Sequence, residues 1–174
     1  MGPASRERTW KRTGGDKSDG MENKKSLGIL LNTVELNIAV FAFLLNFAWE
    51  ILQGGLYAGF NELSYKQGVT YCTRATLADV AILLVAFWLV AWLGGGRSWP
   101  LRAGARPTVG FTLLGLVTTV VLEILSTRVW SRWSYDESMP LIPILNVGIA
   151  PFLQWALLPP LTVWLVHRQL SRRG

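Results

Sequence analysis

Residues 36–52 of the chain have the sequence LNIAVFAFLLNFAWEIL, an apolar run that ends with an amide and a carboxylate one helical turn apart. The run is close to the length of about 20 residues that an α-helix needs to cross a bilayer. A carboxylate near the centre of a spanning helix costs about 2.5–3.5 kcal/mol, so Glu50 is expected to face protein or a cavity. On a helix Asn46, Glu50 and Gln53 lie on one face, with Trp49 beside them. This face is the first candidate for a functional site.

The composition is typical of a polytopic membrane protein. Of the 174 residues, 51% are hydrophobic, 16% are charged and nine are tryptophans, and the apolar runs are too long for the core of a small soluble domain. The net charge of +6 comes from basic residues that flank these runs instead of forming one patch with aromatic residues, so we expect no nucleic-acid partner. The single cysteine, Cys72, and the single histidine, His167, leave no disulfide and no cysteine or histidine metal site. We therefore expect no metal and no other cofactor.

Four apolar segments approach or exceed the spanning length, at residues 36–52, 75–93, 108–125 and 141–166. We predict an all-α polytopic membrane protein, with a four-transmembrane-helix bundle over residues 34–167. Residues 1–33 have the polar, mixed-charge composition of a disordered tail, and residues 168–174 are expected to form a short basic tail. The last apolar segment contains four prolines, so it is either one kinked helix or a re-entrant piece followed by a helix.

The lysines and arginines predict the orientation in the membrane. Seven lie in the N-terminal tail, three in the loop 94–107 and three at the C-terminus, whereas the loops 53–74 and 126–140 hold two each. Because basic residues concentrate on the cytoplasmic side, both termini and the middle loop are expected in the cytoplasm and the other two loops outside.

Aromatic residues stand near both ends of the predicted helices, where amphipathic rings are enriched in membrane proteins. Trp92 and Trp99 fit a belt at the cytoplasmic interface, and Trp130, Trp133 and Tyr135 fit one at the outer interface. We interpret the run from Trp133 to Tyr135 as an interfacial anchor, with a catalytic loop as the alternative.

Each predicted helix carries a polar side chain at about the same depth. With a rise of about 1.5 Å per residue, the residues Glu50, Asp79, Glu123 and Asn146 all fall in the outer third of the membrane, and Gln154 lies two turns from Asn146. A bundle that turns these faces inward would gather three carboxyl groups in one cavity. Since nearby carboxyl groups in a low dielectric cannot all ionise, at least one is expected to hold a proton near neutral pH. A protonated carboxylic acid is a proton donor.

Each acid also has a structural interpretation. Glu50 could form a hydrogen bond with Asn46 or with a tryptophan N–H and have no further role, although acids inside a membrane are commonly functional. Asp79 and Glu123 lie nearer the interface, where they could reach lipid headgroups or nearby arginines. Both interpretations stay open for all three acids.

Several motifs together carry a resemblance to known proteins. They are Asn46-x-x-Trp49-Glu50, Asp79, Glu123, Trp133-x-Tyr135 with Met139-Pro140, and Pro151-x-x-Gln154-Trp155. From about residue 46 to residue 164 this set resembles an uncharacterised family of small, four-span bacterial membrane proteins, which implies a multi-pass protein of the bacterial inner membrane.

The first motif is also similar to the first helix of integral-membrane terpene cyclases, whose carboxylic acids protonate an alkene or epoxide. The later motifs look like lycopene-cyclase-type membrane domains, which carry adjacent acids where this chain has Phe152, Leu153 and Gln154, so only Glu50 matches by motif.

These patterns predict a pocket for an apolar, lipid-like molecule such as an isoprenoid, with acid-catalysed isomerisation or cyclisation as its chemistry. Glu50 would donate the proton, with Asp79 or Glu123 as its charge partner. Trp49 and Trp155 would form walls that stabilise a developing cation. The substrate-binding and orienting groups would be Asn46, Gln53, Asn146 and Gln154.

Two other functions are kept as alternatives. One is a small proton-coupled transporter of amphiphilic compounds, and the other is an accessory subunit whose polar residues only hold helices together. The expected partner is a membrane lipid or a hydrophobic small molecule. Whether the protein forms a homo-oligomer stays open, because Gly110 and Gly115 do not stand in the GxxxG register of helix dimers.

Overall fold

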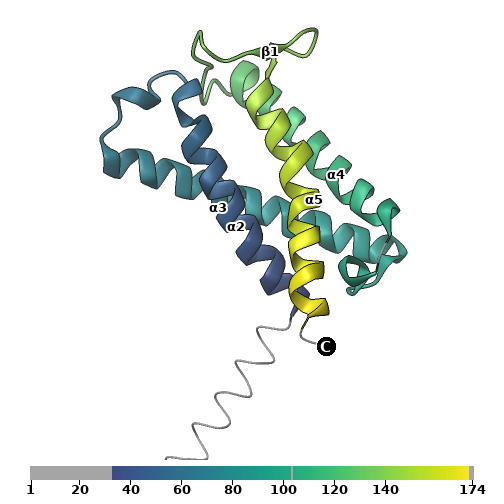
Figure 1. Ribbon diagram of the computed structural model, residues 1–174. Coiled ribbons are helices and arrows are strands. Elements are labelled where there is room, and N and C mark those ends of the chain that lie inside the picture. The colour runs from purple at the N-terminus through teal and green to yellow at the C-terminus, as the bar shows by residue number, and fades with distance from the viewer. Residues whose placement is uncertain (1–32, 103, 173–174) are drawn as a thin grey trace, which may run out of the picture. The chain divides into compact units, whose positions relative to one another are not determined.

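The computed structural model describes residues 33–102 and 104–172 and is almost entirely helical in this part of the chain (Figure 1). The four long helices are α2 (Val34–Gln53), α3 (Tyr65–Val90), α4 (Ala105–Ile124) and α5 (Ile149–Ser171). Together with short continuations at their ends, all four are long and apolar enough to cross a membrane. The predicted all-α class with four helices of spanning length is therefore confirmed. Except for Thr33, the predicted N-terminal tail lies outside the described residues.

Short elements extend or connect the long helices. The 3₁₀ helices η1 (Gly54–Leu56) and η2 (Phe60–Glu62) lie between α2 and α3, and the 3₁₀ helix η4 (Trp99–Leu101) lies before α4. The π-helical turns η3 (Ala91–Gly95) and η5 (Leu125–Val129) continue α3 and α4. An antiparallel hairpin of two short strands, β1 (Leu141–Ile142) and β2 (Val147–Gly148), precedes α5.

Helix α3 begins at Tyr65, earlier than the predicted start at residue 75. Its first turn is stabilised by Gln67, whose Oε1 accepts a hydrogen bond from the backbone N–H of Ser64 at 3.0 Å and one from its hydroxyl at 2.7 Å. This Ser-x-x-Gln pattern is a capping box, a signal for a helix start. Much of the predicted outer loop is therefore helix, and Arg74 lies on α3.

The last apolar segment is only partly helical. Residues 141–148 form the hairpin, in whose turn Ile144 and Asn146 have φ angles of 75° and 49°. One kinked helix over 141–166 does not describe this region, because an apolar run alone does not distinguish a helix from short strands. A short piece followed by a helix, as in the other alternative, does describe it, and the short piece is a β-hairpin. Helix α5 itself is continuous, contains two internal prolines and extends through Ser171 into the predicted C-terminal tail.

The helices form a bundle in which α2 packs against α3 and α5, and α4 packs against α5 and α3. Figure 1 shows that α3 crosses α2 and α5 at a steep angle. The steep crossing means that different stretches of α3 meet different neighbours.

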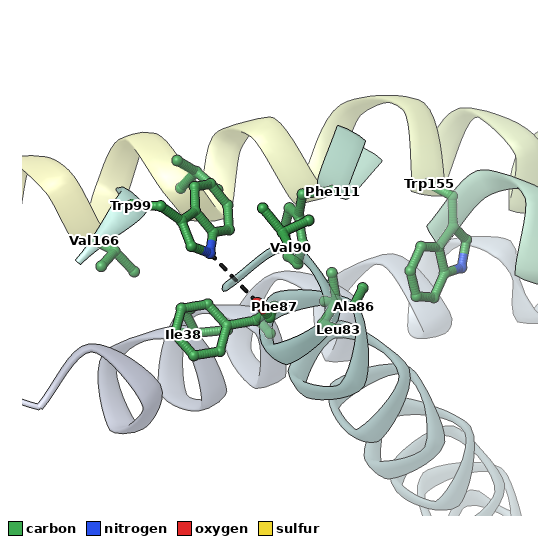
Figure 2. Packing of buried hydrophobic residues seen from close by; sticks show 11 residues of the cluster. Ile38, Leu83, Ala86, Phe87, Val90, Trp99, Phe111, Trp155 and Val166 are labelled. Carbon is green, nitrogen blue, oxygen red and sulfur yellow. Dashed lines mark hydrogen bonds between the residues drawn. The ribbon is translucent and has the colours of Figure 1, made fainter. Parts of the chain in front are cut away.

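The hydrophobic core lies toward the end of the bundle where α2 begins and α5 ends (Figure 2). Trp99 is 1% exposed there, with its ring centroid 6.0 Å from that of Phe87 and 5.4 Å from that of Phe111. Its indole N–H donates a hydrogen bond to the carbonyl oxygen of Phe87 at 3.4 Å. The predicted interfacial position of Trp99 is therefore wrong. Trp155 stands apart from most of the cluster in Figure 2.

Candidate functional site

A cavity of about 450 Å³ lies in the polar half of the bundle, with walls from all four long helices. It brings together the three acids that the sequence singled out. Its polar lining consists of Glu50, Gln53, Tyr57, Tyr71, Arg74, Asp79, Thr119, Glu123, Ser126, Arg132 and Gln154. Its apolar lining consists of Ala75, Ala78, Ile82, Leu122, Trp130, Trp133, Pro151 and Trp155.

One face of α2 supplies much of the polar side of this site. Asn46, Glu50 and Gln53 are all buried, with exposed fractions of 1%, 8% and 4%. They stand one turn apart along the helix, as the 3.6-residue period requires for a shared face. Tyr57, just beyond η1, lines the cavity from the same side of the chain.

Gln154 on α5 lies at the centre of the hydrogen-bond network. Its Oε1 accepts a hydrogen bond from Gln53 Nε2 at 3.0 Å. Its Nε2 faces three oxygens, from Asn46 at 2.9 Å, Asp79 at 3.1 Å and Glu50 at 3.2 Å. An amide nitrogen carries two hydrogens, so three acceptors compete for two donors. This one side chain joins α2, α3 and α5.

Glu50 and Asp79 lie close together, because both accept a hydrogen bond from the same Gln154 amide nitrogen. Two carboxyl groups this close in a low dielectric do not both ionise, so one of the two is expected to hold a proton. Glu50 Oε1 accepts a further hydrogen bond from Gln53 Nε2 at 2.8 Å. Glu50 thus accepts from the Gln53 and Gln154 amides, and not from the Asn46 amide or tryptophan N–H of the structural interpretation. The Glu50–Asp79 pair is a site that can hold and deliver one proton.

Glu123 on α4 has different surroundings from the other two acids. One oxygen, Oε2, accepts hydrogen bonds from the Tyr135 hydroxyl at 2.5 Å and the Trp133 indole N–H at 3.3 Å. The other, Oε1, accepts one from the Tyr57 hydroxyl at 3.4 Å. Burial raises the pKa of Tyr57 and of Tyr135 above the usual tyrosine value, and the neighbouring Glu123 raises both further. Both hydroxyls therefore keep their protons and act as donors to the carboxylate.

Trp133 and Tyr135 are half-buried and donate hydrogen bonds to Glu123, so both contact the site, and their interpretation as an interfacial anchor stays a prediction. Trp130 has an exposed fraction of 51%. Tyr57 was missed by the sequence analysis, although it continues the helical face of Asn46 and Glu50 and this spacing could have revealed it.

The two loops at this end of the bundle are joined by backbone hydrogen bonds. Tyr57 and Tyr135 form an antiparallel β-bridge, flanked by hydrogen bonds from the Ala58 N–H to the Ser134 carbonyl at 3.0 Å and from the Asp136 N–H to the Leu56 carbonyl at 2.9 Å. The segment that carries Trp133 is thereby fixed to the end of α2. This pairing holds the indole against Glu123.

Replacing Tyr135 with phenylalanine is expected to lower the free energy of unfolding by about 1.5 kcal/mol, because it removes a buried hydrogen bond to Glu123. Tyr57→Phe should cost less, since its hydroxyl lies farther from Glu123. Chemical unfolding in detergent micelles, followed by tryptophan fluorescence, measures both changes. Tyr65→Phe is the control, because the Tyr65 side chain is 88% exposed. A larger loss for Tyr57→Phe than for Tyr135→Phe would contradict this account of the Glu123 contacts.

The remaining predicted site residues lie around the cavity or away from it. Trp49 does not line the cavity, and its indole N–H donates to Gln53 Oε1 at 3.0 Å, so it orients Gln53 instead of forming a wall. Asn46 lies behind the wall, where its amide nitrogen donates to the Ala42 carbonyl at 2.7 Å and its oxygen accepts from Gln154. Asn146 is exposed in the hairpin turn, so its predicted place on a helix beside the acids is wrong. Trp155 does form a wall.

Within residues 33–102 and 104–172, no group of three or more His, Cys, Asp and Glu side chains is placed to hold a metal ion. The chemistry available from the described residues is that of carboxyl, amide, phenol, indole and guanidinium groups. Of these, the acid pair is suited to proton transfer and the amides to its orientation.

Comparisons with protein-family models, with curated proteins and with solved structures found no match for this chain. The resemblance to bacterial membrane proteins and terpene cyclases therefore stays a prediction. Fold and site define a class: a protein of four helices, each of membrane-spanning length, around an acid-containing cavity.

Proposed function

We propose that the chain is a multi-pass protein of the bacterial inner membrane, crossed by α2 to α5, with both termini in the cytoplasm. The lysine and arginine distribution supports this orientation. At the end of the bundle assigned to the cytoplasm, the Arg97 guanidinium lies 5.1 Å from the Trp88 ring centroid, and that of Arg168 lies 5.2 Å from the Trp164 ring centroid. Aromatic rings paired with cations suit the boundary between lipid and water.

We infer that the cavity binds an apolar, isoprenoid-like lipid and catalyses its acid-promoted isomerisation or cyclisation. The observation that carries this proposal is the close approach of Glu50 and Asp79, which both accept from the Gln154 amide nitrogen in the wall of the cavity. A carboxyl group that holds a proton next to an apolar substrate is a general acid. Exclusion of water strengthens its electrostatic interactions and protects a reactive intermediate.

The proton moves from a carboxyl oxygen of the pair to one carbon of a carbon–carbon double bond. The O–H bond breaks, the π electrons form the new C–H bond, and a cation develops on the neighbouring carbon. The indole rings of Trp133 and Trp155, both in the wall, stabilise that cation through their π faces. Loss of a proton from another adjacent carbon returns the proton to the carboxylate, so the product has the same atomic composition as the substrate.

Mass spectrometry of the lipid that copurifies with the protein, before and after incubation in D₂O, tests this function. The wild type is expected to retain a defined unsaturated lipid that gains deuterium, because proton delivery and return exchange its hydrogens. Glu50→Gln and Asp79→Asn should slow the exchange by about 100-fold or more. Glu137→Gln is the matched control, since Glu137 is an exposed acid outside the cavity.

Three outcomes separate binding from chemistry. A bound lipid with exchange that depends on Glu50 and Asp79 supports the whole proposal. A bound lipid without exchange in the wild type would leave a binding protein and reject the catalytic step. A wild-type protein free of lipid would reject both.

A further inference from the structure

Two arginines from different parts of the chain line the same cavity. Arg74 lies on α3, and Arg132 lies in the segment that follows η5. Both side chains are exposed, so they stand where the cavity meets its surroundings. Among the described residues neither forms an ion pair, and the ion pair that is present, between Arg97 and Glu35, lies at the opposite end of the bundle.

The acids of the cavity do not neutralise these arginines. Both oxygens of Glu123 accept hydrogen bonds from phenol and indole groups, and Glu50 and Asp79 both accept from Gln154. None of the three acids forms an ion pair with a described arginine. The cavity thus has a wall with acids bound to neutral donors and an edge with two guanidinium groups.

Arg128, one turn after Glu123, shows that an arginine at this end can also be occupied by the protein. Its guanidinium donates a hydrogen bond to the Leu145 carbonyl of the hairpin, and the residue does not line the cavity. Arg74 and Arg132 both line the cavity, and neither guanidinium forms a hydrogen bond with a described residue.

We propose that the ligand of this cavity is an anionic amphiphile, whose phosphate or carboxylate headgroup binds Arg74 and Arg132 while its apolar chain lies along the wall that contains Trp155. This rests on the proposed function, namely that the cavity takes a lipid-like molecule. The planar fork of a guanidinium matches two oxygens of a phosphate or carboxylate, and the pair would contact the headgroup from two sides. The attraction is strengthened where the surroundings are less polar than bulk water. The same two charges repel a cationic headgroup, which disfavours the transport of cationic amphiphiles.

Binding of three probes with one chain and different headgroups tests this inference. The probes are dodecyl phosphate, dodecanol and dodecyltrimethylammonium, measured by native mass spectrometry of the full chain in a neutral detergent. The wild type is expected to bind dodecyl phosphate about tenfold or more tightly than dodecanol, and dodecyltrimethylammonium most weakly. The double variant Arg74→Gln/Arg132→Gln should lose the preference for dodecyl phosphate and bind dodecanol as the wild type does.

Lys66→Gln provides the matched control. It removes one positive charge from the exposed start of α3, outside the cavity, and should leave all three affinities unchanged. An equal loss of dodecyl phosphate binding in this variant would show a general charge effect and overturn the assignment to the two arginines.

Competition experiments distinguish the sources of the headgroup. Displacement of dodecyl phosphate by phosphatidylglycerol supports a bilayer phospholipid as the ligand, and no displacement supports a single-chain amphiphile. Displacement by inorganic phosphate alone would overturn the proposal, because the site would not need the apolar chain of the amphiphile.

Equal wild-type affinities for dodecyl phosphate and dodecanol would overturn the headgroup assignment and leave the lipid pocket intact. Failure of all three probes to bind would reject the pocket as well.

Discussion

Replacing Gln154 with leucine is expected to lower the free energy of unfolding by about 3 kcal/mol, because several buried polar groups lose their shared partner at once. The Gln154 side chain is 2% exposed and contacts the side-chain oxygens of Asn46, Glu50 and Asp79 as well as the amide nitrogen of Gln53. Leucine has a similar size but offers no donor and no acceptor, so the loss would come mainly from these contacts. A buried polar group left without a partner costs about 1–3 kcal/mol.

Unfolding in detergent micelles by guanidinium, followed by fluorescence, measures this loss. Gln169→Leu is the matched control, because Gln169 is a half-buried glutamine toward the other end of α5 and does not line the cavity. We expect that control to change the free energy by less than about 1 kcal/mol. Equal effects of the two substitutions would mean that the network around Gln154 contributes no special stability.

Gly115→Ala is expected to destabilise the protein by about 2 kcal/mol through overpacking. A Cβ atom at this position would lie 2.4 Å from Cε3 and 2.5 Å from Cζ3 of Trp155, so the indole ring has to move. Trp155 is 3% exposed and lines the cavity, and its displacement changes the wall that a ligand contacts. The substitution should therefore weaken lipid binding as well as stability.

Gly110→Ala on the same helix provides the control for Gly115→Ala. No atom lies within 4 Å of a Cβ at Gly110, so alanine there should stabilise the helix by about 0.5–1 kcal/mol through its higher helix propensity. Combining Gly115→Ala with Trp155→Leu should cost less than the sum of the two single changes, because the smaller side chain removes the clash. Equal stabilities for Gly115→Ala and Gly110→Ala would contradict the close contact.

The four helices and the polar face of α2 could be predicted from the sequence, because they depend on properties within one helix. Hydrophobic length predicts a span, and the 3.6-residue period places Asn46, Glu50 and Gln53 on one face. The same regularities predicted that the three acids would lie together, and all three line one cavity. The early start of α3 could also have been predicted, since Ser64 and Gln67 form a capping box in the sequence.

The partners across the bundle could not be predicted, because they depend on packing between distant segments. Nothing local to Trp99 distinguishes an interfacial indole from one buried against Phe87 and Phe111. The apolar stretch that begins at residue 141 likewise forms a hairpin because of its turn, which removes Asn146 from the site. Gln154 was expected to orient a substrate, but its contacts with two other helices, α2 and α3, follow only from the tertiary structure.

The two hydrogens of the Gln154 amide nitrogen can be distributed among their acceptors in more than one way. Two hydrogens shared among three oxygens allow several arrangements, and in each of them one of Asn46, Asp79 and Glu50 receives nothing from Gln154. The patterns differ in which of the three oxygens is left without a hydrogen bond from Gln154. A bound molecule with a hydroxyl group that donated to the oxygen left without a Gln154 hydrogen bond would favour one pattern. The position of the proton in the acid pair would then depend on the molecule that is bound.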